Sequence, residues 1–168
     1  MSDAVYAPVD TAVGTVFAAQ SDLGVRFVHP YPADEIFEVE YESRFGFRPT
    51  RVDRLPKQVE LGIRTGDPAG VAIDWRGTSL FTQAVLQHTG EIPSGEVTTY
   101  LKIADAIGRP AAARAVGRAL GANPVPFLVP CHRVIASDGS LGGFGLGAPM
   151  KQALLEAEGV LLPPRTTA

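Results

Sequence analysis

Three prolines crowd the approach to the only cysteine of the chain, and this segment limits the local fold more than any other. Pro124, Pro126 and Pro130 fall within seven residues, and Cys131 follows at once. A proline lacks the backbone N–H and has a fixed φ, so neither a helix interior nor a central strand passes through such a segment. We therefore expect an extended, rigid lead-in that ends at Pro130 in a helical turn.

The residues that follow the prolines indicate a reactive thiol, although a lone cysteine is more often a small buried hydrophobe. His132 is a candidate base toward the Cys131 thiol. Arg133 and Arg118 would favour the thiolate by their charge. Because neighbouring side chains of a strand point to opposite faces, Cys131 and His132 cooperate only if the backbone turns between them.

A third group should orient His132, and Glu158 is the candidate. Residues Pro149–Glu158 are typical of a helix that Gly159 ends, and Glu158 lies beside an apolar stripe. The expected stripe is Met150, Ala153, Leu154 and Ala157. In the last turn of a helix a carboxylate opposes the helix dipole, which favours a functional role. A frayed surface glutamate is the alternative.

Composition excludes several classes of protein. With one cysteine, the chain forms no internal disulfide and no zinc site built from several cysteines. No apolar run has the length of a membrane span, and the N-terminus lacks a signal-peptide pattern. The expectation is a cytoplasmic, monomeric protein that needs neither metal nor organic cofactor.

The first part of the chain, residues 1–76, is expected to form a small α/β domain. Ser21–Gly24 separates two β-rich segments and predicts a hairpin, and Thr65–Pro68 predicts a turn. The expected elements are strands at Val13–Gln20 and Val25–His29, a helix or strand at Glu35–Phe45, a helix at Leu55–Leu61 and a last strand at Val71–Trp75.

The second part, residues 77–168, is expected to be mainly helical and to contain a helix-turn-helix. Leu80–Gln87 has a helical pattern, and Thr98 or Thr99 is a candidate cap for a helix that runs to Ile107. Gly108-Arg109-Pro110 then stops one helix and starts the next, with Pro110 in its first turn and Gly121 at its end. Such a pair is more often two packed helices than a DNA-binding motif.

The second helix of this pair favours DNA binding. One face carries Ala112, Ala113, Val116, Ala119 and Leu120, and the opposite face carries Ala111, Arg114, Gly117, Arg118 and Gly121. A face of arginines and very small residues suits close approach to phosphates or a narrow groove. The chain has a net charge of −3, but residues 107–137 hold four arginines and no carboxylate, so the acidic first part masks a locally basic second part.

In their order, these motifs resemble the O6-alkylguanine-DNA alkyltransferase family. The resemblance covers about Phe81 to Gly159, and the N-terminal part matches loosely, through its hairpin and Gly77-Thr78. Its motifs are Ile92-Pro93-Ser94-Gly95 with Thr99-Tyr100, then Ala112–Gly117, Asn123–Pro126 and Pro130–Val134. It implies an α/β domain with an antiparallel sheet, followed by a winged-helix-like domain with a helix-turn-helix that binds the minor groove of double-stranded DNA.

The resemblance also implies roles for individual residues. Cys131 would accept the alkyl group of O6-alkylguanine, or alternatively of O4-alkylthymine, once and irreversibly, with His132 and Glu158 as base and orienter through a water. Tyr100 would give a proton toward guanine N3, and Asn123 would tie the second helix to the cysteine turn. Arg114 would fill the gap left by the flipped nucleotide. Further DNA contacts would fall on Thr99, Ala115, Gly117 and Arg118, and Val134, Phe144 and Gly145 would line the substrate pocket.

The loop after the cysteine departs from the family pattern. The run Gly143-Phe144-Gly145-Leu146-Gly147 has Phe144 where the family has a tyrosine, and Leu146 replaces a glycine. Thr89 and Gly90 also stand at usually apolar positions, which predicts an early helix end. Three other functions stay open: a non-catalytic sensor of alkylated DNA, a helix-turn-helix regulator with a redox-sensing Cys131, and a Cys-His hydrolase.

Overall fold

The computed structural model describes residues 3–162, and its contacts form two compact units. The first unit runs to Gly77 and includes Pro124–Leu128, and the second holds Thr78–Asn123 and continues from Val129. These units differ from the expected domains, residues 1–76 and 77–168, in two respects: Gly77 and the segment Pro124–Leu128 both belong to the first unit. The segment Pro124–Leu128 packs with the first unit, and the backbone N–H of Val28 donates to the Pro124 carbonyl at 3.0 Å.

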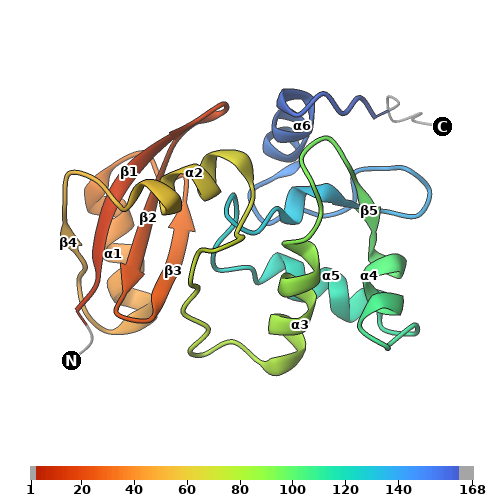
Figure 1. Ribbon diagram of the computed structural model, residues 1–168, viewed down its shortest axis with the longest axis horizontal. Coiled ribbons are helices and arrows are strands. Elements are labelled where there is room, and N and C mark those ends of the chain that lie inside the picture. The colour runs from red at the N-terminus through yellow and green to blue at the C-terminus, as the bar shows by residue number, and fades with distance from the viewer. Residues whose placement is uncertain (1–2, 163–168) are drawn as a thin grey trace. The chain divides into compact units, whose positions relative to one another are not determined.

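A four-stranded sheet in the order β3-β2-β1-β4 forms the centre of the first unit (Figure 1). Strands β1 (Val5–Thr11), β2 (Gly14–Ser21) and β3 (Gly24–His29) are antiparallel, and β4 (Thr50–Arg51) pairs parallel to β1. The predicted hairpin is confirmed as β2 and β3, whereas β1 was not predicted. The prediction of a last strand at Val71–Trp75 is wrong, because only Ile73 forms an isolated bridge, with Val25.

Helix α1 (Asp34–Phe45) packs its aromatic residues on this sheet, and α2 (Lys57–Thr65) contacts β1. The segment Glu35–Phe45, for which sequence allowed a helix or a strand, is therefore helical. Phe37 and Tyr41 are one helical turn apart, lie on the same helix face and are fully buried. Helix α2 begins two residues later than predicted, since Pro56 forms its N-cap. The core cluster is Ala4, Tyr6, Phe17, Ala19, Phe27, Phe37 and Tyr41.

The second unit packs three helices together and adds a short parallel strand pair (Figure 1). The helices are α3 (Leu80–Thr89), α4 (Tyr100–Ala106) and α5 (Ala113–Gly121), and the strands are β5 (Thr98–Thr99) and β6 (Val134–Ile135). The 3-10 turn η1 (Cys131–Arg133) and helix α6 (Ala148–Ala157) complete it. Thr99 caps α4 as predicted, with its hydroxyl accepting from the Lys102 N–H at 3.2 Å.

The helix-turn-helix forms from α4 and α5, with one correction to its link. Helix α5 begins at Ala113, and Pro110 lies in a turn that the Ala112 N–H closes on the Arg109 carbonyl. The predicted two-sidedness of α5 is confirmed. Its buried residues are Val116, Ala119 and Leu120, and its exposed residues are Arg114, Arg118 and Gly121.

The proline-rich lead-in is turned and not extended, contrary to our expectation. Phe127 has a φ of 72°, the left-handed region that side chains rarely adopt, and residues 126–128 form a turn around it. The Cys131 N–H donates to the Val129 carbonyl at 2.8 Å across Pro130, which makes a tight three-residue turn. The predicted helical turn after Pro130 is confirmed as η1.

Candidate active site

Three consecutive residues of the turn η1, each with a different chemistry, are buried. Cys131 is 6% exposed, His132 is 2% exposed and Arg133 is 1% exposed. In a 3-10 turn, successive side chains are separated by about a third of a revolution. Cys131 lines a cavity, while His132 and Arg133 both reach Glu158. The backbone turn that Cys131 and His132 require is therefore present.

Glu158, the cap residue at the end of α6, is the centre of a buried polar network. His132 Nε2 lies 2.9 Å from Glu158 Oε1, and Arg133 donates through Nη2 to Oε1 at 2.6 Å and through Nε to Oε2 at 3.0 Å. Arg133 Nη1 also donates to the Ile92 carbonyl at 2.7 Å. Burial alone would raise the pKa of Glu158, but the hydrogen bonds from His132 and Arg133 outweigh it and hold the pKa at about 2.

The network determines which nitrogen of His132 is available as a base. Burial lowers the pKa of His132, against the opposing effect of Glu158, so the ring is neutral at neutral pH. An ionised carboxylate only accepts hydrogen bonds, so the Nε2 proton faces Glu158 and Nδ1 keeps its lone pair. Nδ1 is buried and has no hydrogen-bond partner among residues 3–162. The ring thus presents an unused acceptor, as a general base requires.

Burial raises the pKa of the Cys131 thiol, which therefore needs a base to become a nucleophile. A hydrogen bond from the Asn123 side chain and the nearby charge of Lys151 act in the opposite direction. Asn123 also donates to the Val129 carbonyl at 3.1 Å, which ties the end of α5 to the cysteine turn. Arg133 does not take the predicted place beside the thiol, because its guanidinium binds Glu158.

A cavity of about 610 Å³ lies above Cys131 and contains most of the residues predicted to meet the substrate. Of the predicted residues, its lining includes Tyr100, Arg114, Gly117, Arg118, Cys131, Phe144 and Gly145. Leu101, Ala136 and Ser137 line it as well. Thr99, Ala115 and Val134 do not line the cavity, and Val134 is fully buried in β6.

Tyr100 and the loop after β6 meet at one wall of this cavity. The Tyr100 hydroxyl donates to the Gly143 carbonyl at 3.2 Å. Gly142 has a φ of +72°, and a Cβ there would lie 2.6 Å from the Tyr100 hydroxyl oxygen, so only a glycine allows this approach. Phe144 adds an aromatic wall without a hydroxyl group.

Lys151 is a buried residue of this region that the sequence analysis missed. It is 0% exposed, and its Nζ donates to the Val134 carbonyl at 2.6 Å and to the Gly143 carbonyl at 3.2 Å. The predicted stripe of α6 is confirmed only at Leu154: the other buried residues are Lys151 and Leu155, and Ala157 is exposed. Lys151 and Glu158 share one helix face with Leu154 and Leu155, and two charges on an apolar stripe were a readable signal.

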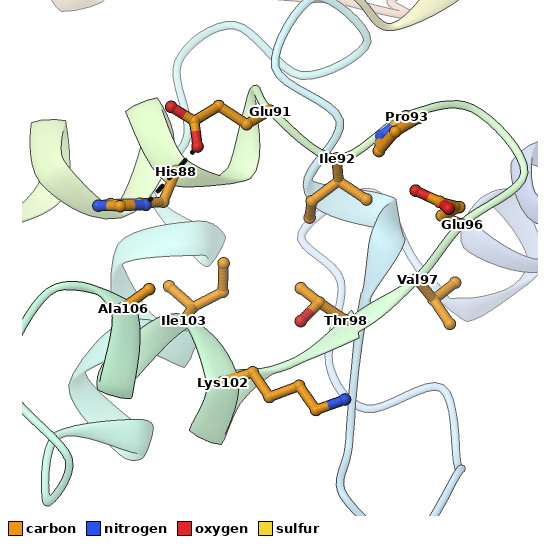
Figure 2. A pocket seen from close by; sticks show the side chains of 10 residues that line it. All are labelled: His88, Glu91, Ile92, Pro93, Glu96, Val97, Thr98, Lys102, Ile103 and Ala106. Carbon is orange, nitrogen blue, oxygen red and sulfur yellow. Dashed lines mark ion pairs between the residues drawn. The ribbon is translucent and has the colours of Figure 1, made fainter.

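A second cavity of the same unit, about 540 Å³, has no cysteine in its lining. Figure 2 shows its mixed lining, with Glu91 and Glu96 on one side and Lys102 on the other. His88 Nδ1 lies 3.9 Å from Glu91 Oε2, the ion pair drawn there. Among residues 3–162 no group of three or more His, Cys, Asp or Glu is placed to hold a metal ion.

Known proteins resemble this chain in both sequence and fold. A family model described as the DNA-binding domain of 6-O-methylguanine DNA methyltransferase matches residues 80–160. The crystal structure of Mycobacterium tuberculosis OGT in complex with DNA is 33% identical, with a TM-score of 0.73 over 92% of both chains. The chain belongs to the O6-methylguanine-DNA methyltransferase family. Residues 80–160, which the family model matches, include the cysteine turn, Glu158 and the loop that lines the cavity.

Curated members of the O6-methylguanine-DNA methyltransferase family match in two ways. A methylated-DNA–protein-cysteine methyltransferase of Mycobacterium tuberculosis is 53% identical over 88 residues, which are 52% of this chain and 53% of that protein. The regulatory protein Ada of Salmonella typhimurium is 36% identical over 159 residues, 91% of this chain and 45% of that protein. The chain spans about half the length of these relatives. No helix among the described residues is long and apolar enough to cross a membrane.

Proposed function

We propose that the protein repairs O6-alkylguanine in DNA by moving the alkyl group onto its own Cys131, once per molecule. The observation that carries the proposal is the pairing of a cavity-lining thiol with a neutral, Glu158-bound His132 whose other ring nitrogen is unused. Family membership supplies the substrate class. O4-alkylthymine is the alternative substrate.

The transfer is a single displacement at carbon. His132 takes the thiol proton through a water, the Cys131 sulfur attacks the alkyl carbon, and the bond from that carbon to guanine O6 breaks. The electron pair of the broken bond goes to the base, and Tyr100 gives its proton toward N3 as this charge grows. The proton that His132 took from the thiol then returns to the Tyr100 oxygen, so the base gains one proton in all and only Cys131 stays changed. The thioether product has no leaving route, so the protein is consumed.

The partner in this proposal is double-stranded DNA, approached through its minor groove. Arg114 and Arg118 project from the exposed side of α5 and line the same cavity as Cys131. The reactive carbon must leave the base stack to reach a buried thiol, so the nucleotide flips and Arg114 takes its place. Very small neighbours on α5, among them Gly117, allow the close approach. We propose that the protein acts as a cytoplasmic monomer.

The experiment is intact-protein mass spectrometry after exposure to duplex DNA that contains O6-methylguanine. We expect the mass to rise by one CH2 unit, located on Cys131 by peptide mapping, with product reaching no more than one equivalent. Cys131→Ser should bind the DNA and gain no mass. Binding without a mass shift would favour the sensor, turnover beyond one equivalent the hydrolase, and a change with peroxide alone the redox regulator.

A further inference from the structure

Lys151 is fully buried, which is rare for a lysine. A lysine is almost never fully buried unless it is paired with an anion, yet Lys151 is 0% exposed and forms no ion pair within residues 3–162. Its partners are the carbonyl oxygens of Val134 and Gly143. The cost of burying this ammonium group points to a role beyond packing, because an apolar residue of similar length would fill the space of its stem.

The two carbonyls belong to separate segments that must stay together over Cys131. Val134 directly follows the cysteine turn and pairs with β5, whereas Gly143 lies in the loop that lines the cavity. The Gly143 carbonyl accepts from both Lys151 and Tyr100. The Tyr100 and Phe144 rings lie 5.8 and 5.9 Å from Nζ. One ammonium group therefore contacts both sides of the site.

The loop has few other attachments. None of residues 140–147 is buried, and Gly142, Gly143 and Gly145 are exposed. Among the described residues, backbone hydrogen bonds attach it only at its two ends, where the Ser140 carbonyl accepts from the Ala136 N–H and the Gly147 carbonyl accepts from the Lys151 N–H. A glycine-rich segment without buried side chains has high conformational freedom, so its position depends on the bonds that Lys151 and Tyr100 make to Gly143.

We propose that Lys151 is a positioning residue that holds the loop 142–145 against Tyr100 and over Cys131. The proposal rests on the proposed function for its effect on alkyl transfer, but not for its effect on the loop. When the loop is held, its backbone N–H groups and the Tyr100 phenol keep fixed places around the leaving base. When it is released, the donors must be ordered during the reaction, and the rate falls.

The protonation state of Lys151 fits this role. Burial lowers its pKa to about 8, and the Cys131 thiol, when charged, opposes that effect. The other polar groups around the ammonium are the His132 ring, which is neutral, and the Tyr100 phenol, whose pKa burial raises. At neutral pH most molecules thus carry the charged form, which makes the stronger hydrogen bonds to the two carbonyls.

The test compares Lys151→Met with Lys57→Met, the same change at an exposed lysine of α2. The readout that needs no activity is the ¹⁵N order parameter of residues 142–145. We expect it to fall below about 0.6 in Lys151→Met, while α5 keeps rigid values near about 0.85. Single-turnover methyl transfer should slow by about tenfold or more, with duplex affinity within about twofold of wild type. Lys57→Met should change neither quantity.

A second variant keeps the proposal testable if Lys151→Met unfolds because its two carbonyls lose their donor. Lys151→Ala leaves a space that water reaches, and propylammonium should restore both loop order and transfer rate, whereas bulky tert-butylammonium should not. Unchanged order parameters in a folded variant, or equal effects of the two amines, would overturn the proposal. If wild-type protein gains no alkyl group from DNA, the proposed function fails, and the order parameters still decide the role of Lys151.

Discussion

Glu158 shows how one side chain sets the protonation of its neighbours. It accepts two hydrogen bonds from Arg133 and one from His132, so its negative charge fixes the His132 tautomer. Arg133 would appear from sequence to act on the thiol, but its contribution is to keep Glu158 ionised. The thiol instead has Asn123 and Lys151 close by. The proposed base is thus prepared by charges that never touch the substrate.

Glu158→Gln is expected to slow alkyl transfer with little loss of DNA affinity. Glutamine keeps the shape but not the charge, so neither the His132 tautomer nor the Arg133 pair is held. The single-turnover rate should fall on the order of 100-fold, the scale of a lost general base. Duplex affinity from a binding titration should stay within about threefold, since Glu158 does not line the cavity. A large loss of affinity with an unchanged rate would contradict this assignment.

Tyr100 and Phe144 both line the cavity, and in the proposed reaction Tyr100 is the proton donor and Phe144 an apolar surface. Tyr100→Phe should slow transfer by about a hundredfold, because the only side-chain hydroxyl assigned to the leaving base is lost. Phe144→Tyr should change the rate far less in either direction. Phe144→Ala should affect benzyl transfer more than methyl transfer, because it removes wall area and no charge. A tenfold or greater gain in methyl transfer for Phe144→Tyr would show that the missing hydroxyl matters.

At the scale of elements, sequence predicted what is decided locally. The apolar positions of α5 and the Thr99 cap depend on residues one helical turn apart, and the cysteine turn on an adjacent proline. The rest depends on distant partners. Phe127 adopts a left-handed backbone within a packed turn, and Lys151 is buried because carbonyls at Val134 and Gly143 accept its protons. Neither the backbone conformation of Phe127 nor the burial of Lys151 can be predicted from the residues next to it in the sequence.

Helix α5 is expected to act only when the substrate is a duplex. Arg114→Ala should slow repair of duplex DNA at least tenfold more than reaction with free O6-benzylguanine, because only the duplex requires a flipped nucleotide. Arg118→Ala, by losing one phosphate contact, should lower the slope of log affinity against log salt by about one unit. Arg109, in the link before α5, offers a matched exposed arginine outside the cavity lining. Equal losses of Arg114→Ala on both substrates would argue against its role in flipping.

At the scale of the whole molecule, each unit contains a carboxylate that is largely shielded from solvent and kept charged by arginine. Glu158 is held by Arg133 in the second unit. In the first unit, burial alone would raise the pKa of Asp74, but hydrogen bonds from Arg76 and Ser21 lower it to about 2. Asp74 is 2% exposed, so solvent screens these bonds little. The stability of both units should therefore decrease in acid, where these carboxylates become protonated.

This dependence predicts how stability changes in acid. The usual pKa values of these two carboxyls are 3.8 and 4.5, and both fall to about 2 in the folded protein. Between about pH 4.5 and pH 2 the unfolded chain therefore binds more protons, so stability is fully present above this window and is lost as the pH falls through it. Asp74 alone should account for about 2 kcal/mol of the loss.

Urea unfolding followed by the fluorescence of Trp75, the only tryptophan, reports on the first unit. Asp74→Asn should flatten the change in unfolding free energy between pH 6 and pH 3, whereas Asp53→Asn, at an exposed carboxylate, should leave the wild-type slope. An equally steep acid response in Asp74→Asn would place the acid-sensitive group elsewhere.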